Sequence, residues 1–345
     1  MTVKRGALRA DKPAMQSILR IAAAVLAITV GFDTGASTSS PWQRPAVAPA
    51  PADNQVTAAR VELGRALFFD PRLSAKGSLS CASCHNPALG WSDGLPTAVG
   101  HNMKVLARST PTIVNAAFNP LQMWDGRKGS LEEQALGPFG VDEQNLPLEE
   151  LERRVQSISG YSPMFAAAYP GEPITRTTIA KAIASFERTV LSEGAPFDQF
   201  VAGDQDALSP AARRGFDIFV GKANCAACHQ GFNFTDNGFH NVGVRDSGSP
   251  DVGRFAFKKV ASMQGAFKTP TLRDIALTAP YMHNGCYGTL EEVVAHYVRG
   301  GDVKDHLSPD VRPLDLSEQE QSDLVAFMRS LTSAPRVVSV PTLPR

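Results

Sequence analysis

Two short stretches of this sequence, CASCH at residues 81–85 and CAACH at residues 225–229, are copies of one pattern. In each, two cysteines three residues apart are followed directly by a histidine. This pattern is the attachment site of c-type haem. On one helical turn the two sulfurs lie on the same face, where each can bond a haem vinyl group, and the histidine is placed to ligate the iron. Redox or zinc motifs share part of this spacing, but two copies in one chain favour two covalently bound c-type haems.

The pattern assigns six residues to haem binding, with the two histidines as iron ligands. They are Cys81, Cys84 and His85 for the first haem and Cys225, Cys228 and His229 for the second. The fifth cysteine, Cys286, then has no partner left. We expect it to be a buried or semi-buried thiol without a role.

Length and charge limit the classes of function. The chain has 345 residues, enough for about two domains at roughly 150 residues each. Lys plus Arg and Asp plus Glu each total 34, so no strong electrostatic field favours nucleic acid. We therefore expect no nucleic-acid partner.

The N-terminus has the composition of a targeting segment. A start rich in Lys and Arg precedes the apolar run Ile21–Phe32, which is too short to span a bilayer comfortably. Small residues at 34–36 offer a cleavage site. This arrangement is typical of a signal peptide over residues 1–36 and predicts export to the periplasm, with an uncleaved N-terminal anchor as the alternative. Residues 37–55, rich in Pro and Ala, are expected to form an extended tether.

Most of the remaining chain has helical periodicity. Residues 146–158 and 175–193 show it clearly, and Gly, Pro and Asp break it over 194–210, the expected linker. Ser209 and Pro210 are typical of the start of a helix that leads into the second haem motif. We predict a mainly α fold of two cytochrome c-like haem domains packed against each other. Their expected ranges are 56–200 and 201–335, followed by a tail at 336–345.

Blocks around both motifs resemble those of the bacterial di-haem cytochrome c peroxidase and MauG family, in family order, from about Val56 to Ser333. They include ELGRALFFDPRLS (62–74), STPTIVNAAFNPLQMWDGRKGSLEEQALGP (109–138), FTDNGFHNVGV (234–244) and KTPTLRDIALTAPYMHNG (268–285). The resemblance implies that peroxide reacts at the first haem. It also implies that the second haem stores or relays an oxidising equivalent.

The resemblance also implies catalytic residues beside the first haem. A histidine at the place of His101 caps this haem at rest in the peroxidases, whereas MauG-type enzymes lack the cap. Trp124 matches a tryptophan between the haems, where an indole can relay electrons, and Gln134 matches a glutamine near the peroxide pocket. The non-catalytic alternatives are that His101 is a surface histidine and that Trp124 is a core aromatic residue.

A further catalytic residue is a glutamate that moves a proton between the two peroxide oxygens. The block GPFGVDEQNLP is one residue shorter here than is usual in the family. With the deletion the match is Glu143, and without it the match is Gln144. We predict Glu143, with Asp142 and Gln144 as alternatives, and a solvated acidic turn as the non-catalytic interpretation.

The sixth ligand of the second haem is expected in the stretch GTLEEVVAHYVRGG (288–301). Thr289 and Glu292 form a capping box, and the apolar stripe that follows ends at Tyr297. By resemblance Tyr297 is the iron ligand, as in MauG, where respiratory peroxidases have methionine. A phenolate favours oxidised iron. His296 and Met282 are competing ligands, and a core tyrosine is the alternative.

The block TAPYMHNG resembles a hinge that binds calcium through backbone carbonyls in this family. Thr278 and Pro280 match two contributors, but the third is Ser109 rather than the usual asparagine. Serine is a poorer donor to a hard cation. By resemblance, His240 and His283 lie near the second haem.

The resulting prediction is a periplasmic di-haem peroxidase that reduces hydrogen peroxide with electrons passed through the second haem. Its donor would be a small cytochrome c or a cupredoxin, and a homodimer is a further expectation. One alternative is a MauG-like enzyme that uses peroxide-derived, high-valent haem to oxidise a partner protein. Another is a non-catalytic di-haem electron carrier.

Overall fold

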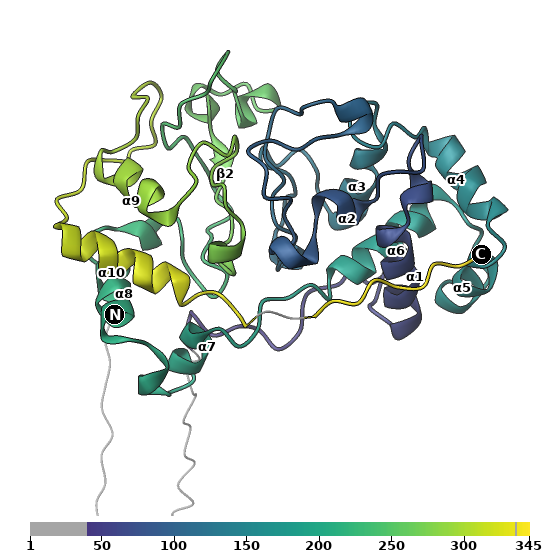
Figure 1. The fold of residues 1–345 in the computed structure, drawn as a ribbon, viewed down its shortest axis with the longest axis horizontal. Helices are drawn as coiled ribbons and strands as arrows, with labels where there is room; N and C mark the ends of the chain where they lie inside the picture. The colour runs from purple at the N-terminus through teal and green to yellow at the C-terminus, as the bar shows by residue number, and fades with distance from the viewer. Residues whose placement is uncertain (1–39, 335–336) are drawn as a thin grey trace, which may run out of the picture. The chain divides into compact units, whose positions relative to one another are not determined.

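The computed structural model describes residues 40–334 and 337–345, and residues 40–345 belong to one compact unit. The signal peptide predicted over residues 1–36 lies outside the described residues. The unit is built mainly of helices (Figure 1). Its α-helices are α1 (Ala58–Phe69), α2 (Cys81–Cys84), α3 (Leu131–Ala135), α4 (Leu148–Ser157), α5 (Tyr161–Ala168), α6 (Arg176–Glu187), α7 (Pro196–Val201), α8 (Pro210–Val220), α9 (Leu290–Val298) and α10 (Glu318–Arg329).

Short elements complete the fold. The two strands β1 (Phe239–His240) and β2 (Phe267–Lys268) pair antiparallel. The 3-10 turns are η1 (Pro71–Leu73), η2 (Pro87–Leu89), η3 (His101–Met103), η4 (Ala116–Phe118), η5 (Gly137–Phe139), η6 (Gln205–Ala207), η7 (Cys225–Ala227), η8 (Arg254–Ala256), η9 (Ala261–Met263) and η10 (Ile275–Leu277). The prediction of a mainly α fold is confirmed.

Each half of the unit is centred on one close helix crossing. In the first half, α1 crosses α6 where Gly64 meets Ala182, and in the second, α8 crosses α10 where Gly215 meets Asp323. A Cβ at either glycine would overlap the facing backbone carbonyl, so only glycine permits this approach. In both halves the first helix of the pair precedes a CxxCH motif. Two separate apolar cores surround the two crossings.

The helix starts follow the predicted capping chemistry. Ser209 accepts a hydrogen bond from Ala212 N, with Pro210 in the first turn of α8. Thr289 and Glu292 form a capping box at the start of α9, and Ser317 begins α10 in the same way. Each box satisfies backbone N–H groups that the first helical turn would otherwise leave without acceptors.

The segment expected to be a linker, 194–210, is more ordered than its composition suggests. It contains α7, whose Phe197 is fully buried in the second apolar core. Arg273, also fully buried, donates to the Asp198 carboxylate at 2.6 Å. The Gly and Pro residues that predicted a linker therefore lie near the ends of a short, packed helix.

The two ends of the unit cross over between the halves. Trp42, in the predicted tether, packs on Phe234 and Phe216 of the second half, with ring centroids 5.0 and 5.5 Å apart. In the other direction, the Gly160 amide of the first half donates to Arg345 O at 2.7 Å. Arg72 Nη2 likewise donates to Pro344 O at 2.8 Å. Each end of the described chain thus completes the half to which it does not belong in sequence.

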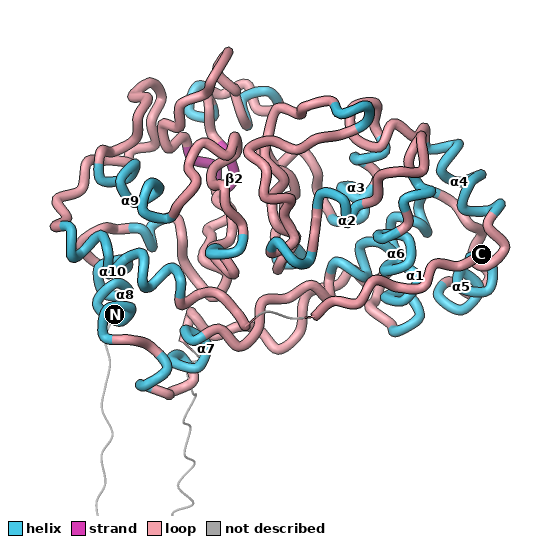
Figure 2. The backbone as a smooth tube through the Cα atoms, viewed as in Figure 1, coloured by secondary structure: helices cyan, strands magenta, loops and turns pink. Residues whose placement is uncertain are grey.

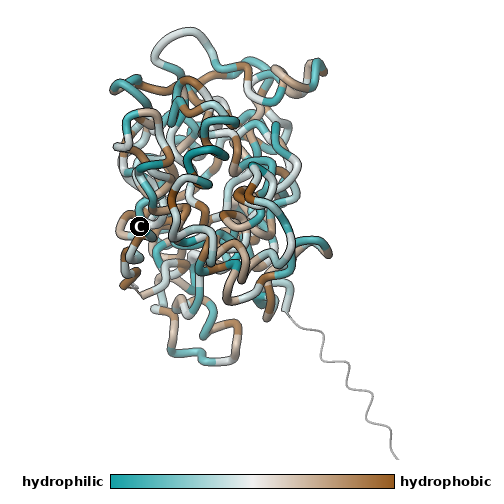
Figure 3. The backbone as a smooth tube through the Cα atoms, turned by 90° about the vertical axis from the view of Figure 1, so that its right-hand side faces the viewer, coloured by the Kyte–Doolittle hydropathy of each residue, from teal (hydrophilic) through white to brown (hydrophobic). Residues whose placement is uncertain are grey.

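Loops occupy the region between the two helical groups (Figure 2). In a second view, apolar stretches alternate with hydrophilic ones along the chain (Figure 3). Within residues 40–334 and 337–345, no helix has the length and hydropathy needed to cross a bilayer.

Candidate haem sites

One continuous cavity of about 1460 Å³ contains both CxxCH motifs. A pocket for a single small ligand usually measures about 300–1,000 Å³, so this volume fits two large groups better than one. All six predicted haem-binding residues line it: Cys81, Cys84, His85, Cys225, Cys228 and His229. The cysteines are unpaired, and both cysteines of each motif border this space. Cys286 also borders it but is exposed, which contradicts the expectation of a buried or semi-buried thiol. The residues present therefore fit two covalently bound haems.

Both motif histidines are held in the tautomer that an iron ligand needs. His85 Nδ1 lies 3.1 Å from Trp91 O, and His229 Nδ1 lies 2.9 Å from Phe234 O. A carbonyl can only accept, so each Nδ1 carries the proton and, in the neutral ring, each Nε2 keeps its lone pair. Burial lowers the pKa of both imidazoles and keeps them neutral. In metal sites, a hydrogen bond from the ring nitrogen that does not bind the metal orients the ligating histidine in this way.

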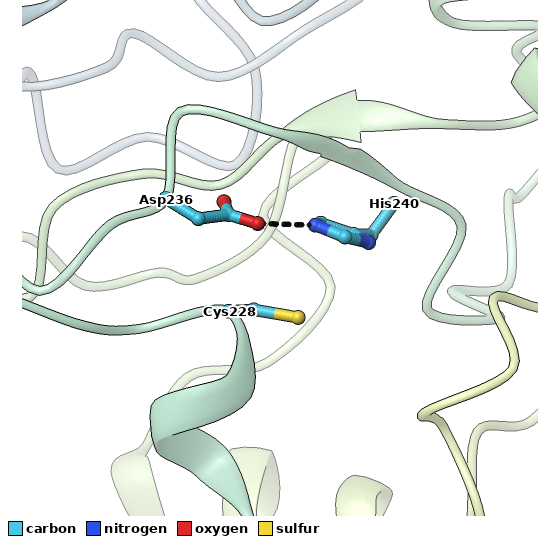
Figure 4. Close-up of side chains that lie close together, drawn as sticks. All are labelled: Cys228, Asp236 and His240. Carbon is cyan, nitrogen blue, oxygen red and sulfur yellow. Dashed lines mark hydrogen bonds and ion pairs between the residues drawn. The ribbon is translucent and has the colours of Figure 1, made fainter. Parts of the chain in front are cut away.

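A cluster beside the second motif combines Cys228, Asp236 and His240 (Figure 4). His240 Nε2 lies 2.8 Å from Asp236 Oδ2, and the Asp236 amide donates to Cys228 O at 2.7 Å. The three side chains have the chemistry of a metal site, but Cys228 belongs to the haem motif. His240 lines the cavity, at a position that the resemblance places near the second haem.

The candidates for peroxide chemistry lie along the first half of the cavity. Gln134, Glu143 and Gln144 all line it. Burial raises the pKa of the half-buried Glu143 above its usual value, against the opposing effect of Arg127. Gln144 is buried, and its Nε2 lies 3.9 Å from Cys81 Sγ. The structure therefore brings Glu143 and both of its alternatives, Asp142 and Gln144, to the same cavity. Asp142 is exposed and contacts Lys104, and Gln144 cannot carry a proton.

His101 is positioned differently. Its amide donates to Asp142 O and Glu143 O, at 3.2 and 2.7 Å, which joins its loop to the Glu143 segment. Its half-buried side chain is not part of the cavity lining, although Val99 and Gly100 are. In this conformation His101 is therefore adjacent to the first site without facing it.

Trp124 lies where the two halves meet. Its Nε1 donates to Ser109 O at 3.0 Å, and its carbonyl accepts from the Lys268 amide of β2 at 2.8 Å. The indole lines the cavity that both motifs share. The following Asp125 accepts from Arg127 Nη1 at 2.7 Å and fixes the loop. This position suits the predicted relay.

Tyr297 lines the second half of the cavity, and its hydroxyl has no hydrogen-bond partner among the described residues. His296, by contrast, uses both ring nitrogens. Its Nε2 lies 2.9 Å from Val242 O and its Nδ1 lies 2.8 Å from Tyr287 Oη. Of the three competing ligands, His296 is thus engaged elsewhere, whereas Tyr297 and Met282 border the cavity.

The predicted calcium contributors Thr278 and Pro280 also border this cavity. Ser109, at the position of the usual asparagine, is already engaged. Its hydroxyl donates to Met282 O at 2.9 Å and its amide to His283 O at 2.7 Å. Ser109 therefore joins the two halves of the unit, and its hydroxyl is already hydrogen-bonded rather than free to bind a cation.

Two buried ionisable residues at the cavity were not predicted. Glu187 is 4% exposed and Lys268 is 8% exposed. Burial lowers the pKa of Lys268 to about 8. The signal for Glu187 was available, because it follows Ile179 and Ile183 at intervals of four on an apolar helix face. Lys268, in a two-residue strand, gave no such signal.

Comparison with known proteins agrees with this geometry. Residues 58–206 match the family di-haem cytochrome c peroxidase, and residues 212–332 match cytochrome c. The methylamine utilization protein MauG of Methylorubrum extorquens is 45% identical over 90% of this chain and 88% of its own. The cytochrome c551 peroxidase of Pseudomonas aeruginosa is 37% identical over 82% and 81%. A solved MauG-like protein associated with microbial copper homeostasis is 34% identical, with a TM-score of 0.77, over 85% of this chain and 95% of its own.

The fold and the two oriented histidines define a cytochrome c-type protein that uses haem as its cofactor. More specifically, the chain belongs to the di-haem cytochrome c peroxidase and MauG family. It is a haem peroxidase-type oxidoreductase.

Proposed function

We propose that this protein reduces hydrogen peroxide in the pocket of His85, with electrons that enter through the pocket of His229. The observation that carries the proposal is the single cavity that both motifs line, with Trp124 on its wall where the halves meet. When bound there, haem supplies the redox chemistry, and cleavage of one peroxide consumes two electrons and two protons. The rest of the proposal concerns what the side chains contribute.

The motif residues bind and orient. Two thioether bonds per motif would hold each haem covalently. The Nδ1 hydrogen bonds of His85 and His229 keep each Nε2 aimed into the cavity. Trp124, held by Ser109 and Lys268, is the route for electrons between the pockets.

Glu143 is the proton-moving group in this proposal. Its carboxylate takes the proton from one peroxide oxygen and returns it to the other, so that water leaves. A pKa raised by burial brings Glu143 closer to neutral pH, where a general acid–base group works best. Gln134, which cannot titrate, would orient the peroxide by hydrogen bonding. His101 would act only if its loop turned it toward the cavity.

Tyr297 favours a second function, the oxidation of a partner protein. This is the alternative predicted from the sequence. Its unpartnered hydroxyl faces the second half of the cavity, and His296 is engaged elsewhere. A hard phenolate ligand stabilises oxidised iron and disfavours simple electron entry from a small donor. The partner's residues would then supply the two electrons.

The finer expectations remain predictions. They are periplasmic location after cleavage of residues 1–36, haem domains at 56–200 and 201–335 with a tail from 336, a small cytochrome c or cupredoxin as donor, calcium at Thr278 and Pro280, and a homodimer. Calcium has the weakest support, because the Ser109 hydroxyl is already hydrogen-bonded.

Optical and EPR spectra of the resting and half-reduced protein, before and after peroxide, test the proposal. We expect one peroxide-reactive high-spin haem and one low-spin haem. Rapid return to the resting spectrum with a reduced small cytochrome c supports the peroxidase function. An oxidised state that persists with that donor, and decays with a protein substrate, supports the second function. Two low-spin haems that ignore peroxide in both states would overturn both functions and leave an electron carrier.

A further inference from the structure

Glu187, the last residue of α6, is a buried carboxyl group on the wall of the first haem pocket. It is 4% exposed and lines the cavity, and its carboxylate is among the groups that raise the pKa of the Cys81 thiol. Its Oε2 is buried without a hydrogen-bond partner among the described residues. Gln144, which also lies against Cys81, has a buried and unpartnered Oε1. An amide oxygen can only accept, so it cannot neutralise a carboxylate.

Among the charged groups on the surrounding elements, Arg188 lowers the pKa of Glu187, but it does not outweigh burial. On α6 itself, Arg188 is bound to Glu132 of α3 through two contacts of 2.8 and 3.1 Å. The remaining charged groups on α6 and its packing partners are engaged elsewhere or face solvent. Arg176 pairs with Glu149 and Glu152 of α4, Lys181 pairs with Asp53, Arg60 and Arg65 of α1 donate to backbone carbonyls, and Glu62 is exposed.

The segment opposite α6 adds no cation. Asp142 contacts Lys104 at the surface, and Glu143 is itself acidic, with Arg127 acting on it. Cys81 and Cys84 carry no charge as thioethers. An ionised carboxylate buried without a partner costs several kcal/mol. Glu187 is therefore stable at neutral pH as the neutral acid, and burial raises its pKa to about 8.

We propose that Glu187 is a proton-holding residue for the first haem: it takes up one proton when that haem is reduced and releases it on oxidation. The proposal rests on the proposed function, because it requires haem at Cys81 and Cys84. In the pH range where Glu187 is ionised in the oxidised protein, one electron from the donor adds one negative charge to a closed pocket, and one proton from solvent neutralises it on the Glu187 carboxylate. A proton taken up in this way during reduction is stored beside the site where peroxide cleavage consumes protons.

The coupling between proton uptake and reduction predicts how the potential of the first haem changes with pH. Below the pKa of Glu187 in the oxidised protein, the carboxyl is protonated in both redox states and the potential is independent of pH. Between that pKa and the higher pKa of Glu187 in the reduced protein, reduction brings a proton, so the potential of the first haem falls as pH rises. Above both pKa values the potential is again independent of pH. For one proton per electron, the limiting slope is about 59 mV for each tenfold change in proton activity.

The test is a potentiometric titration of both haems about two pH units on either side of the Glu187 pKa of about 8. We expect a sloping potential for the first haem in the wild type. The slope should disappear in Glu187→Gln and persist in Glu172→Gln, a control at an exposed position of the same half. The competing explanation is Glu143, another acid that lines the cavity. A slope that survives Glu187→Gln, or that Glu172→Gln removes as well, overturns the proposal.

A second measurement does not depend on the variant folding. Redox-difference infrared spectroscopy of the wild type at neutral pH should show the C=O stretch of a protonated carboxylic acid that shifts on reduction. Absence of that band overturns the proposal. Haem content and the reaction with peroxide are measured on the same sample. A protein with two haems that reacts with peroxide, but has a pH-independent first potential, refutes this inference and leaves the proposed function intact.

Discussion

Removal of one oxygen atom, by Tyr297→Phe, tests how the second haem is ligated. The ring and its packing stay the same, and no hydrogen bond to a described residue is lost, because the hydroxyl has none. If Tyr297 is only a core residue, the substitution is therefore nearly silent. If its phenolate ligates the iron, the substitution removes the anionic donor that stabilises the oxidised state.

The structure sets the free energy that ligation must overcome. A phenol with a pKa of about 10 must lose its proton to ligate at pH 7, which costs about 4 kcal/mol. Around Tyr297, burial and the Cys225 and Cys228 thiols raise the pKa further, and no cation lowers it. Oxidised iron must therefore supply more than this free energy for the phenolate to stay bound. Each tenfold net preference for oxidised over reduced iron is worth about 59 mV, so a preference of about 10³ raises the potential of the second haem by about 180 mV in Tyr297→Phe.

Redox potentiometry gives the shift, and resonance Raman spectroscopy reports loss of the phenolate vibrations. Tyr281→Phe is the matched control, because Tyr281 lines the same cavity but its hydroxyl donates to Ile275 O at 3.2 Å. It should lose about 0.5–1.5 kcal/mol of stability with no change in potential. An unchanged potential and Raman spectrum in Tyr297→Phe would refute the ligand assignment and direct attention to Met282.

Three further predictions concern attachment, catalysis and stability. Replacing Cys81 and Cys84 together by Ala should abolish peroxide turnover and reduce the haem content per chain from two to one in a pyridine haemochrome assay; haem that acid denaturation extracts from the wild type would contradict covalent attachment. Glu143→Gln should slow the stopped-flow reaction with peroxide by a factor on the order of 10²–10⁴ with both haem spectra intact; a normal rate there with a slow Gln144→Ala would show that the register is wrong by one. Trp42→Ala should lower the free energy of unfolding by about 3 kcal/mol in chemical denaturation, since it leaves a cavity between three phenylalanines; a loss below about 0.5 kcal/mol would mean that its packing is not needed.

The haem motifs and the helix starts could be predicted from the sequence, because each depends on residues close together in the chain. The CxxCH spacing identified the residues that line the cavity, and Ser209, Pro210 and Thr289 marked helix starts correctly. A capping box works through backbone groups only three residues away, so its outcome needs no tertiary information.

The features that the sequence did not predict depend on contacts between residues far apart in the chain. Trp42 sits in a Pro-rich stretch, and only the folded second half provides its aromatic partners. The short helix α7 interrupts the predicted linker because Phe197 has a core to enter. Glu187 fits a helical stripe, but its lack of a partner follows from Arg188 pairing with Glu132. A one-residue deletion likewise leaves Glu143 and Gln144 indistinguishable by counting.

The crossed ends have a consequence for folding. The contact between Arg72 and Pro344 closes a loop of 272 residues, and Trp42 closes another over most of the same span. Such closures cost little more free energy than shorter ones, but they form late because the intervening chain must be organised first. Neither half then reaches its final stability alone, and unfolding should occur as one cooperative transition. Removal of residues 337–345, which lie far from both haem motifs in sequence, would therefore loosen the first half and with it the spacing across which electrons pass.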